Sequence, residues 1–282
     1  MDSSQNNPLA NFFRQPSIYI KLPSDGRWWP TGSLEMPVNR EIPVFSMTTK
    51  DEIILKTPDA LLNGQGVVEV IQSCCPNIKD AWNMPSIDVD TVLIAIRMAT
   101  YGNKMGFESK CSACNEENEH DVELSSLIGG IECPDYSETI PFKGLKIKLH
   151  PQPYFSMNRV NSVSFEEQRL ANILAVSDVD PDVKSHKLAE SMKRLVELNT
   201  ESVTESTEYI EINGDQRVTD KVHIKEFYAL ADAAVVKSVQ DKLSDISSQA
   251  KLRPIALQCN DCKAAYSAEL TFDYANFFGN GS

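Results

Sequence analysis

Alternating apolar and polar residues near the start of the chain predict strands followed by short helices. Residues 17–22 alternate in this way, and residues 42–47 form a second short apolar run, so we expect a strand at each. The segment 48–55 carries acidic residues in its first turn, which favours a helix, and Thr57-Pro58 favours a further helical turn that continues to Leu62. The N-terminal part is therefore predicted to mix strands and helices.

Two further helices and two hairpins are indicated along the chain. Residues 66–75 predict an apolar helix, and residues 88–101 are apolar on more than one face, which is typical of a helix buried inside its domain. Turn signals at Lys143-Gly144 and at Asn213-Gly214-Asp215 each lie between short apolar strands. We expect a β-hairpin at each turn.

The stretch from 155 to 250 is strongly helical. Ser164 and Glu167 have the spacing of a capping box, which predicts that a helix begins there. A second helix is expected to start near Asp180-Pro181, and the longest helix is expected over 223–247, where apolar residues recur at steps of three and four. This stripe consists of Ile224, Tyr228, Ala231, Val235, Val239, Leu243 and Ile246.

Two cysteine motifs are the strongest chemical signal in the sequence. Cys111-Ser-Ala-Cys114 and Cys259-Asn-Asp-Cys262 are both C-x-x-C motifs, here called knuckles, and each is followed by a strand-like segment. Two knuckles supply the four thiolates that a tetrahedral zinc ion prefers. We therefore predict that Cys111, Cys114, Cys259 and Cys262 hold one structural zinc, although 144 residues separate the knuckles.

Free thiols on two unrelated turns, or a redox pair, are the alternatives to zinc. A thioredoxin-like motif lies at a strand-to-helix junction, whereas both knuckles precede strands. His120 follows the first knuckle, but with four thiolates available we interpret it as a surface histidine. We interpret Cys133 as a plain thiol, and Cys74 and Cys75 as core thiols at the end of an apolar helix.

These elements together predict an α+β fold: a mixed N-terminal domain with a split zinc-ribbon-like site, interrupted by a large helical insertion. We expect a flexible arm over 1–16 and a mixed α/β domain with the first knuckle over 17–154. A helical insertion with a β-hairpin is expected over 155–254. The last part, 255–282, is expected to carry the second knuckle and a C-terminal strand that packs on the first.

Charge and composition limit the classes of partner. The 282 residues include 40 acidic and 27 basic side chains, and the formal net charge of −13 repels nucleic-acid backbones and anionic membranes. No apolar run is long enough to span a bilayer, and the start of the chain lacks a secretion signal. We therefore expect a reducing cytoplasm, protein partners, and no direct contact with nucleic acid or membrane.

No catalytic constellation is visible, and we predict that the chain is not an enzyme. The sequence contains no G-x-S-x-G, P-loop or G-x-G-x-x-G motif. Arg27, Trp28 and Trp29 form a candidate partner-binding surface, because Trp and Arg are enriched at the centres of interfaces. The alternative is that the two tryptophans cap an edge of the core.

Short motifs occur in a fixed order before the first knuckle. They are Leu22-Pro23-Ser24-Asp25-Gly26 leading to Trp29-Pro30, then Asp51 to Leu55 with Pro58 to Gly64, then Asp88-Val89-Asp90 through Arg97 to Thr100-Tyr101-Gly102. Over roughly residues 17–125 this series resembles the baseplate hub proteins of T-even-type contractile-tailed bacteriophages. The resemblance implies a non-enzymatic part in hub structure or assembly and contacts with other baseplate proteins. It also implies a location in the host cytoplasm and then in the tail baseplate.

The leading hypothesis is therefore a structural or assembly component of a phage baseplate with a structural zinc. A zinc-ribbon adaptor in a transcription or replication complex is the alternative. A thiol oxidoreductase is a third possibility.

Overall fold

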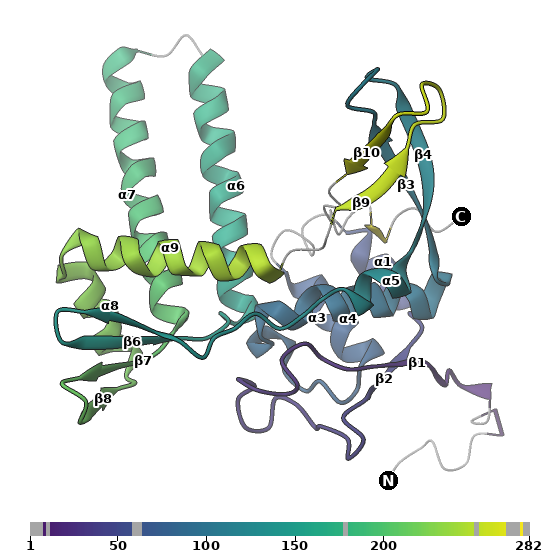
Figure 1. The fold of residues 1–282 in the computed structure, drawn as a ribbon, viewed down its shortest axis with the longest axis horizontal. Helices are drawn as coiled ribbons and strands as arrows, with labels where there is room; N and C mark the ends of the chain where they lie inside the picture. The colour runs from purple at the N-terminus through teal and green to yellow at the C-terminus, as the bar shows by residue number, and fades with distance from the viewer. Residues whose placement is uncertain are drawn as a thin grey trace.

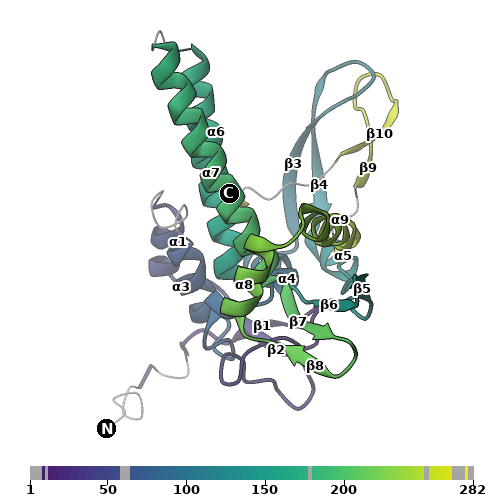
Figure 2. The same ribbon diagram turned by 90° about the vertical axis from the view of Figure 1, so that its left-hand side faces the viewer.

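The computed structural model describes residues 8–9, 12–57, 64–176, 180–250, 254–268 and 277–278. These residues form a mixed α+β fold with two hydrophobic cores joined by the middle of the chain. A pair of long helices and a pair of β-hairpins project to the same side of the molecule, with helix α9 crossing between their bases (Figures 1 and 2).

The first core is built around helix α4, as its sequence predicts. The elements that surround α4 (Ser86–Tyr101) are β1 (Pro16–Ile20), β2 (Ile42–Phe45), α1 (Thr49–Leu55), α3 (Gln65–Cys74) and the 3₁₀ helix η3 (Ala81–Asn83). Val92, Ile94 and Ile96 of α4 are fully buried, and β1 pairs antiparallel with β2 beside them. Burial on all faces of α4 confirms the interpretation of its pattern.

Helix α1 begins where the sequence predicts. The side chain of Thr48 accepts a hydrogen bond from the backbone N–H of Asp51, and the Asp51 carboxylate accepts one from the backbone N–H of Thr48 at 2.7 Å. This reciprocal pair satisfies two donors that a helix start otherwise leaves unpaired. The further helical turn expected from Pro58 to Leu62 lies outside the described residues.

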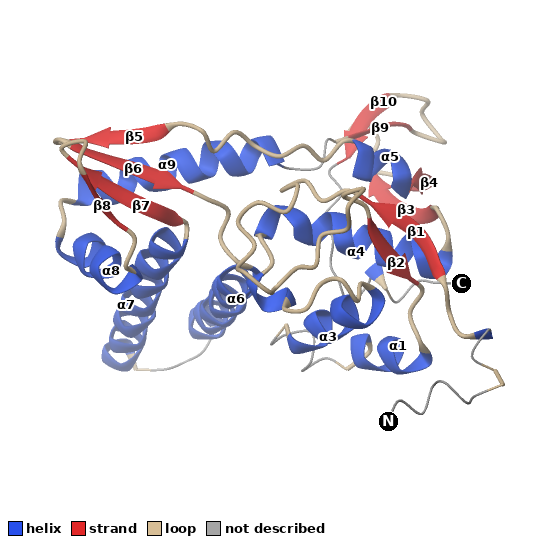
Figure 3. Ribbon diagram, turned by 90° about the horizontal axis from the view of Figure 1, so that it is seen from below, coloured by secondary structure: helices blue, strands red, loops and turns tan. Residues whose placement is uncertain are grey.

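The second core lies under a four-stranded antiparallel sheet, β5-β6-β7-β8 (Figure 3). The strands are β5 (Thr139–Phe142), β6 (Leu145–Leu149), β7 (Thr207–Ile212) and β8 (Gln216–Val218). Both predicted hairpins are present, and Asn213 and Gly214 have positive φ angles of 50° and 86° at the second turn. Because β6 pairs with β7, the sheet joins residues on both sides of the boundary predicted at 154/155.

The prediction of one continuous helix over 223–247 is wrong, whereas the apolar stripe predicted there is confirmed. The chain forms α8 (Lys221–Leu230) and α9 (Ala233–Ala250), because Ala231 is extended and Asp232 accepts a hydrogen bond from the N–H of Ala234 at 3.0 Å. This aspartate starts a new helix. Every predicted stripe residue still packs in or against the second core.

The helix start predicted at Ser164 is also wrong. Helix α6 (Tyr154–Val176) begins ten residues earlier, directly after Pro153, and Ser164 lies in its interior. Glu167 does not cap the helix. Its carboxylate accepts two hydrogen bonds from the Arg194 guanidinium, at 2.5 and 3.2 Å. The pair joins α6 to α7 (Pro181–Glu205), whose predicted start is confirmed because the Asp180 side chain accepts from the N–H of Asp182.

Two β-hairpins carry the knuckles away from the first core. One consists of β3 (Lys104–Lys110) and β4 (Glu117–Glu123) and is followed by a short helix, α5 (Leu124–Gly129). The other consists of β9 (Ile255–Gln258) and β10 (Ala265–Ala268). The strands expected after the knuckles are therefore present at β4 and β10, although residues 269–272 of the second lie outside the described residues.

A buried carboxylate ties the start of α4 to the loop that follows β1. Asp88 is fully buried and accepts three hydrogen bonds, from the N–H of Ser24 at 2.8 Å, its hydroxyl at 2.5 Å, and the Trp29 indole N–H at 2.9 Å. Desolvation raises the pKa of Asp88 to about 6, although these hydrogen bonds oppose the rise. The folded protein therefore takes up a proton here at a pH where the unfolded chain is ionised.

We predict that Asp88→Asn destabilises the protein, and does so more at about pH 4 than at about pH 7. Asparagine has one acceptor oxygen for three donors, which costs about 1–3 kcal/mol. Because the pKa of Asp88 is raised by folding, protonation of Asp88 stabilises the folded protein. This stabilisation is complete below the unfolded pKa of 3.8 and is lost as pH rises through about 6. The destabilisation caused by Asp88→Asn should thus be roughly 2 kcal/mol smaller at pH 7 than at pH 4. Urea denaturation of the native protein and of the Asp88→Asn variant at both pH values measures this difference, with Asp241→Asn, at an exposed position, as the control. A destabilisation that does not change with pH contradicts the prediction.

Candidate metal centre

The four knuckle cysteines come together at one point. The sulfur atoms of Cys111 and Cys262 are 3.7 Å apart, those of Cys114 and Cys259 are 3.6 Å apart, and all four lie within 4.8 Å of one another. These separations are far longer than the roughly 2.05 Å of a disulfide. They are close to the edge of a tetrahedron of sulfurs around a zinc ion, about 3.8 Å for a Zn–S bond of about 2.3 Å.

Each knuckle is folded by the same backbone hydrogen bonds. The N–H of Cys111 donates to the carbonyl of Glu116 and that of Cys259 to the carbonyl of Ala264, both at 2.9 Å. The residues that follow the knuckles, Asn115 and Lys263, both have a φ angle of 60°. The two motifs thus turn their thiols inward by the same local geometry, on hairpins that are far apart in the sequence.

Asn118 links the two knuckles and was missed by the sequence analysis. Its side-chain amide donates to the carbonyl of Glu116 at 3.0 Å and lies 3.5 Å from the sulfur of Cys259, while its oxygen accepts from the N–H of Asn260 at 2.7 Å. The residue is buried in β4 between exposed glutamates. A polar residue at an inward-facing strand position is the signal that could have identified it, because a buried amide needs partners.

The surroundings of the cluster shift the pKa values of Cys259 and Cys114 in opposite directions. Hydrogen bonds from the backbone N–H groups of Cys262 and Asp261, with the Asn118 amide, lower the pKa of Cys259 to about 6. The N–H of Glu116 also lowers the pKa of Cys114, but the nearby sulfurs and desolvation outweigh it and the pKa is about 12. Four thiolates so close together repel one another unless a cation balances their charge.

A small apolar and hydrogen-bonded layer lies beside the sulfurs. Tyr266 of β10 packs with Cys111 and Cys259, and its hydroxyl lies 2.7 Å from the hydroxyl of Ser109 and 3.1 Å from Nε2 of His120. His120 therefore faces Tyr266 and is not one of the four residues that come together. This contact joins β4 of one hairpin to β10 of the other.

The other cysteines lie apart from this cluster. Cys74 and Cys75 are fully buried in the first core, as predicted. The thiol of Cys133 accepts a hydrogen bond from the Arg27 guanidinium at 3.2 Å. Only the four knuckle cysteines group with metal-ligand geometry among the residues that the structure describes.

The side chains of Arg27, Trp28 and Trp29 do not form one surface. Trp29 packs against the first core and donates to Asp88, whereas Trp28 lies edge-to-face against Tyr136 with its ring centroid 5.3 Å away. The Arg27 guanidinium lies over the Trp28 ring at 4.6 Å. Trp29 thus takes the core-capping position, and a partner-binding role for this segment stays a prediction.

Comparison with known families identifies the chain. A family model described as T4 bacteriophage base plate protein matches residues 12–279. The chain belongs to this family. Neither the curated proteins nor the solved structures gave a match.

Membership of a T4 baseplate family confirms the phage baseplate part of the resemblance seen in the sequence, while the hub assignment stays a prediction. A structural family of this kind is usually non-enzymatic, implies contacts with other baseplate proteins, and suggests a location in the virion tail. Within the described part of this baseplate protein, no helix is long and apolar enough to cross a membrane.

We predict that Asn118→Ala weakens metal binding by about 10- to 100-fold, because residues that orient metal ligands have effects of this size. Competition with a chromogenic chelator measures the affinity of the purified baseplate protein. Glu119→Ala, an exposed neighbour on the same strand, is the control and should leave the affinity unchanged. Equal affinities for the two variants contradict a role of Asn118 at the metal.

Proposed function

We propose that this chain is a structural or assembly component of the hub region of a contractile-tail baseplate, and that its four knuckle cysteines hold one structural zinc. The observation that carries the proposal is the convergence of the four sulfurs in a chain of a baseplate family. A closed set of four thiolates leaves no position for a substrate or an activated water, which is the usual arrangement of a structural rather than a catalytic zinc.

The zinc would act as a clasp between distant parts of the chain. Cys111 and Cys114 follow β3, whereas Cys259 and Cys262 lie between β9 and β10, near the C-terminal end. A structural zinc contributes roughly 10–16 kcal/mol in small zinc-finger peptides, comparable to the roughly 5–15 kcal/mol of a whole domain. Zinc at this site would therefore fasten the β9–β10 hairpin to the β3–β4 hairpin and stabilise both.

The hub assignment is supported by the motif series that precedes the first knuckle, and the non-catalytic role by the family. The structure gives parts of that series a packing role, since Ser24, Trp29 and Asp88 form one buried hydrogen-bonded group. Such a group stabilises the first core by joining the loop after β1 to the start of α4. We infer that the protein acts through contacts with other baseplate proteins.

We predict about one zinc per chain in protein purified without chelators, measured by elemental analysis with thiol titration. Cys259→Ser should reduce the zinc content at least tenfold, because the cluster then lacks one of four thiolates. Cys133→Ser, which changes a thiol outside the cluster, should leave it unchanged. A fully folded, metal-free native chain would falsify the zinc proposal.

We further predict that the protein is found in purified tails or in hub assembly intermediates from infected cells. Quantitative mass spectrometry of both fractions distinguishes a component of the finished particle from an assembly factor. Detection only in intermediates identifies an assembly factor, and absence from both fractions rejects the baseplate proposal.

A further inference from the structure

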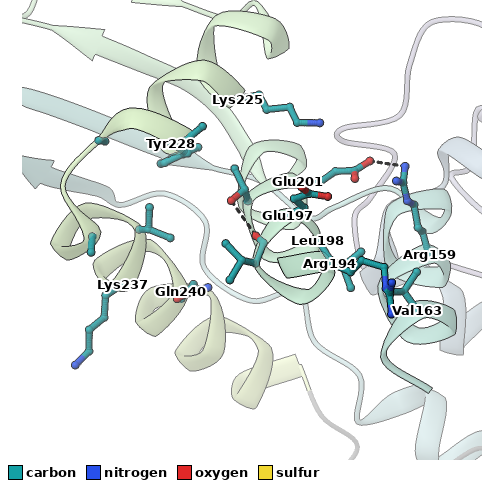
Figure 4. Close-up of a pocket in the computed structure, with 16 residues that line it drawn as sticks. Arg159, Val163, Arg194, Glu197, Leu198, Glu201, Lys225, Tyr228, Lys237 and Gln240 are labelled. Carbon is teal, nitrogen blue, oxygen red and sulfur yellow. Dashed lines mark hydrogen bonds and ion pairs between the residues drawn. The ribbon is translucent and has the colours of Figure 1, made fainter. Parts of the chain in front are cut away.

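A hollow lies where α7 meets α8 and α9. It has a volume of about 910 Å³, and side chains from α6, α7, α8 and α9 line it (Figure 4). Val163, Val196, Leu198 and Val236 give it an apolar lining. Tyr228 also contributes, but its hydroxyl is engaged with Thr207 at 2.8 Å. The hollow therefore offers apolar contact alongside polar and charged side chains.

The apolar surface continues from the hollow along two helices. On α7, Leu188, Met192 and Val196 follow one another at steps of four and so lie on one side, and Met192 and Val196 are 65% and 64% exposed. On α8, Val222 is 73% exposed and shares a face with Ala229, which lines the hollow. We call this combination of hollow and helix faces the α7–α8 groove.

The hollow of the α7–α8 groove is lined by more basic than acidic side chains, whereas the whole chain has more acidic than basic ones. The hollow is lined by four basic side chains, Arg159, Arg194, Lys225 and Lys237, and by two acidic ones, Glu197 and Glu201. Arg159 pairs with Glu201 at 2.7 Å, and Arg194 pairs with the buried Glu167 of α6. Lys225 and Lys237 form no ion pair within the described residues. Besides these two pairs, the two lysines outnumber the one remaining acid of the lining, Glu197, so a chain with net charge −13 has a hollow whose remaining charge is positive.

We propose that the α7–α8 groove binds an acidic amphipathic helix of another baseplate protein; this rests on the proposed function. The apolar face of such a helix would cover Met192 and Val196, and its acidic residues would meet Lys225 and Lys237. A two-fold dimer through the same groove is disfavoured, because it would bring the lysines of one copy toward those of the other. The apolar lining and the net charge both oppose nucleic acid.

Site-specific photo-crosslinking during infection tests this inference. p-Benzoylphenylalanine replaces Met192 in the full-length chain, and the tails and hub intermediates are irradiated. The control places the same group at Ile53, which is 62% exposed on α1 and does not line the hollow. The adduct at Met192 should map by mass spectrometry to an acid-rich helix of another tail protein. Its yield should exceed that at Ile53 by roughly tenfold or more.

Charge reversal tests the basic character of the groove in the same fractions. Lys225→Glu with Lys237→Glu should lower the adduct yield by roughly tenfold, because attraction then becomes repulsion. Lys50→Glu with Lys104→Glu is the matched control, since it makes the same change of charge at two exposed lysines of α1 and β3 that do not line the hollow, and it should leave the yield unchanged. Circular dichroism of the purified variants checks that each is folded.

The outcomes separate this inference from the proposed function. If the chain is present in tails or intermediates, three results reject the groove alone. They are an adduct to a second copy or to nucleic acid, equal yields at the two positions, and a yield that charge reversal does not change. If the chain is absent from both fractions, the proposed function fails and this inference fails with it.

Discussion

The contact between the two knuckles depends on the convergence of four cysteine sulfurs, because few other contacts among the described residues join the two hairpins. A two-stranded hairpin is marginally stable by itself. Among the residues that the structure describes, the buried cluster around the sulfurs consists of Cys111, Cys259 and Tyr266, with Leu257 and Ala268 at its edge. Hydrogen bonds from Asn118 and Tyr266 orient the two hairpins, but they contribute only about 1 kcal/mol each. A cation shared by the four thiolates would contribute several times as much as these contacts together.

The two larger cores do not depend on the cluster in this way. The first core encloses α4, and the second lies between the β5–β8 sheet and helices α8 and α9. Both are built from Val, Ile and Leu side chains that are fully buried, and burial of each contributes about 1.5–3 kcal/mol. If the four cysteines hold a metal, its removal should free the β9–β10 hairpin from the β3–β4 hairpin and leave both cores folded.

Buried polar groups set the positions of elements that the apolar pattern leaves free. Asp88 holds the loop after β1 against α4, and Glu167 holds α6 against Arg194 of α7. Lys221 donates three hydrogen bonds to carbonyls at and just after the end of α7 and joins that end to α8. Each group joins two elements because a charge removed from water needs partners, and those partners come from another part of the chain.

The sequence alone determined the periodic elements, the buried character of α4, the hairpin turns and the identity of the four cysteines. These features are local, since they depend on side-chain spacing and on turn residues such as Asn213-Gly214. Tertiary structure decided what local patterns leave open. It decided that Glu167 pairs with Arg194 rather than capping a helix, that Asp232 divides one apolar stripe between two helices, and that Asn118 joins the knuckles. It also brought sulfurs separated by 144 residues to within 4.8 Å, a contact that spacing suggests and only the folded chain can make.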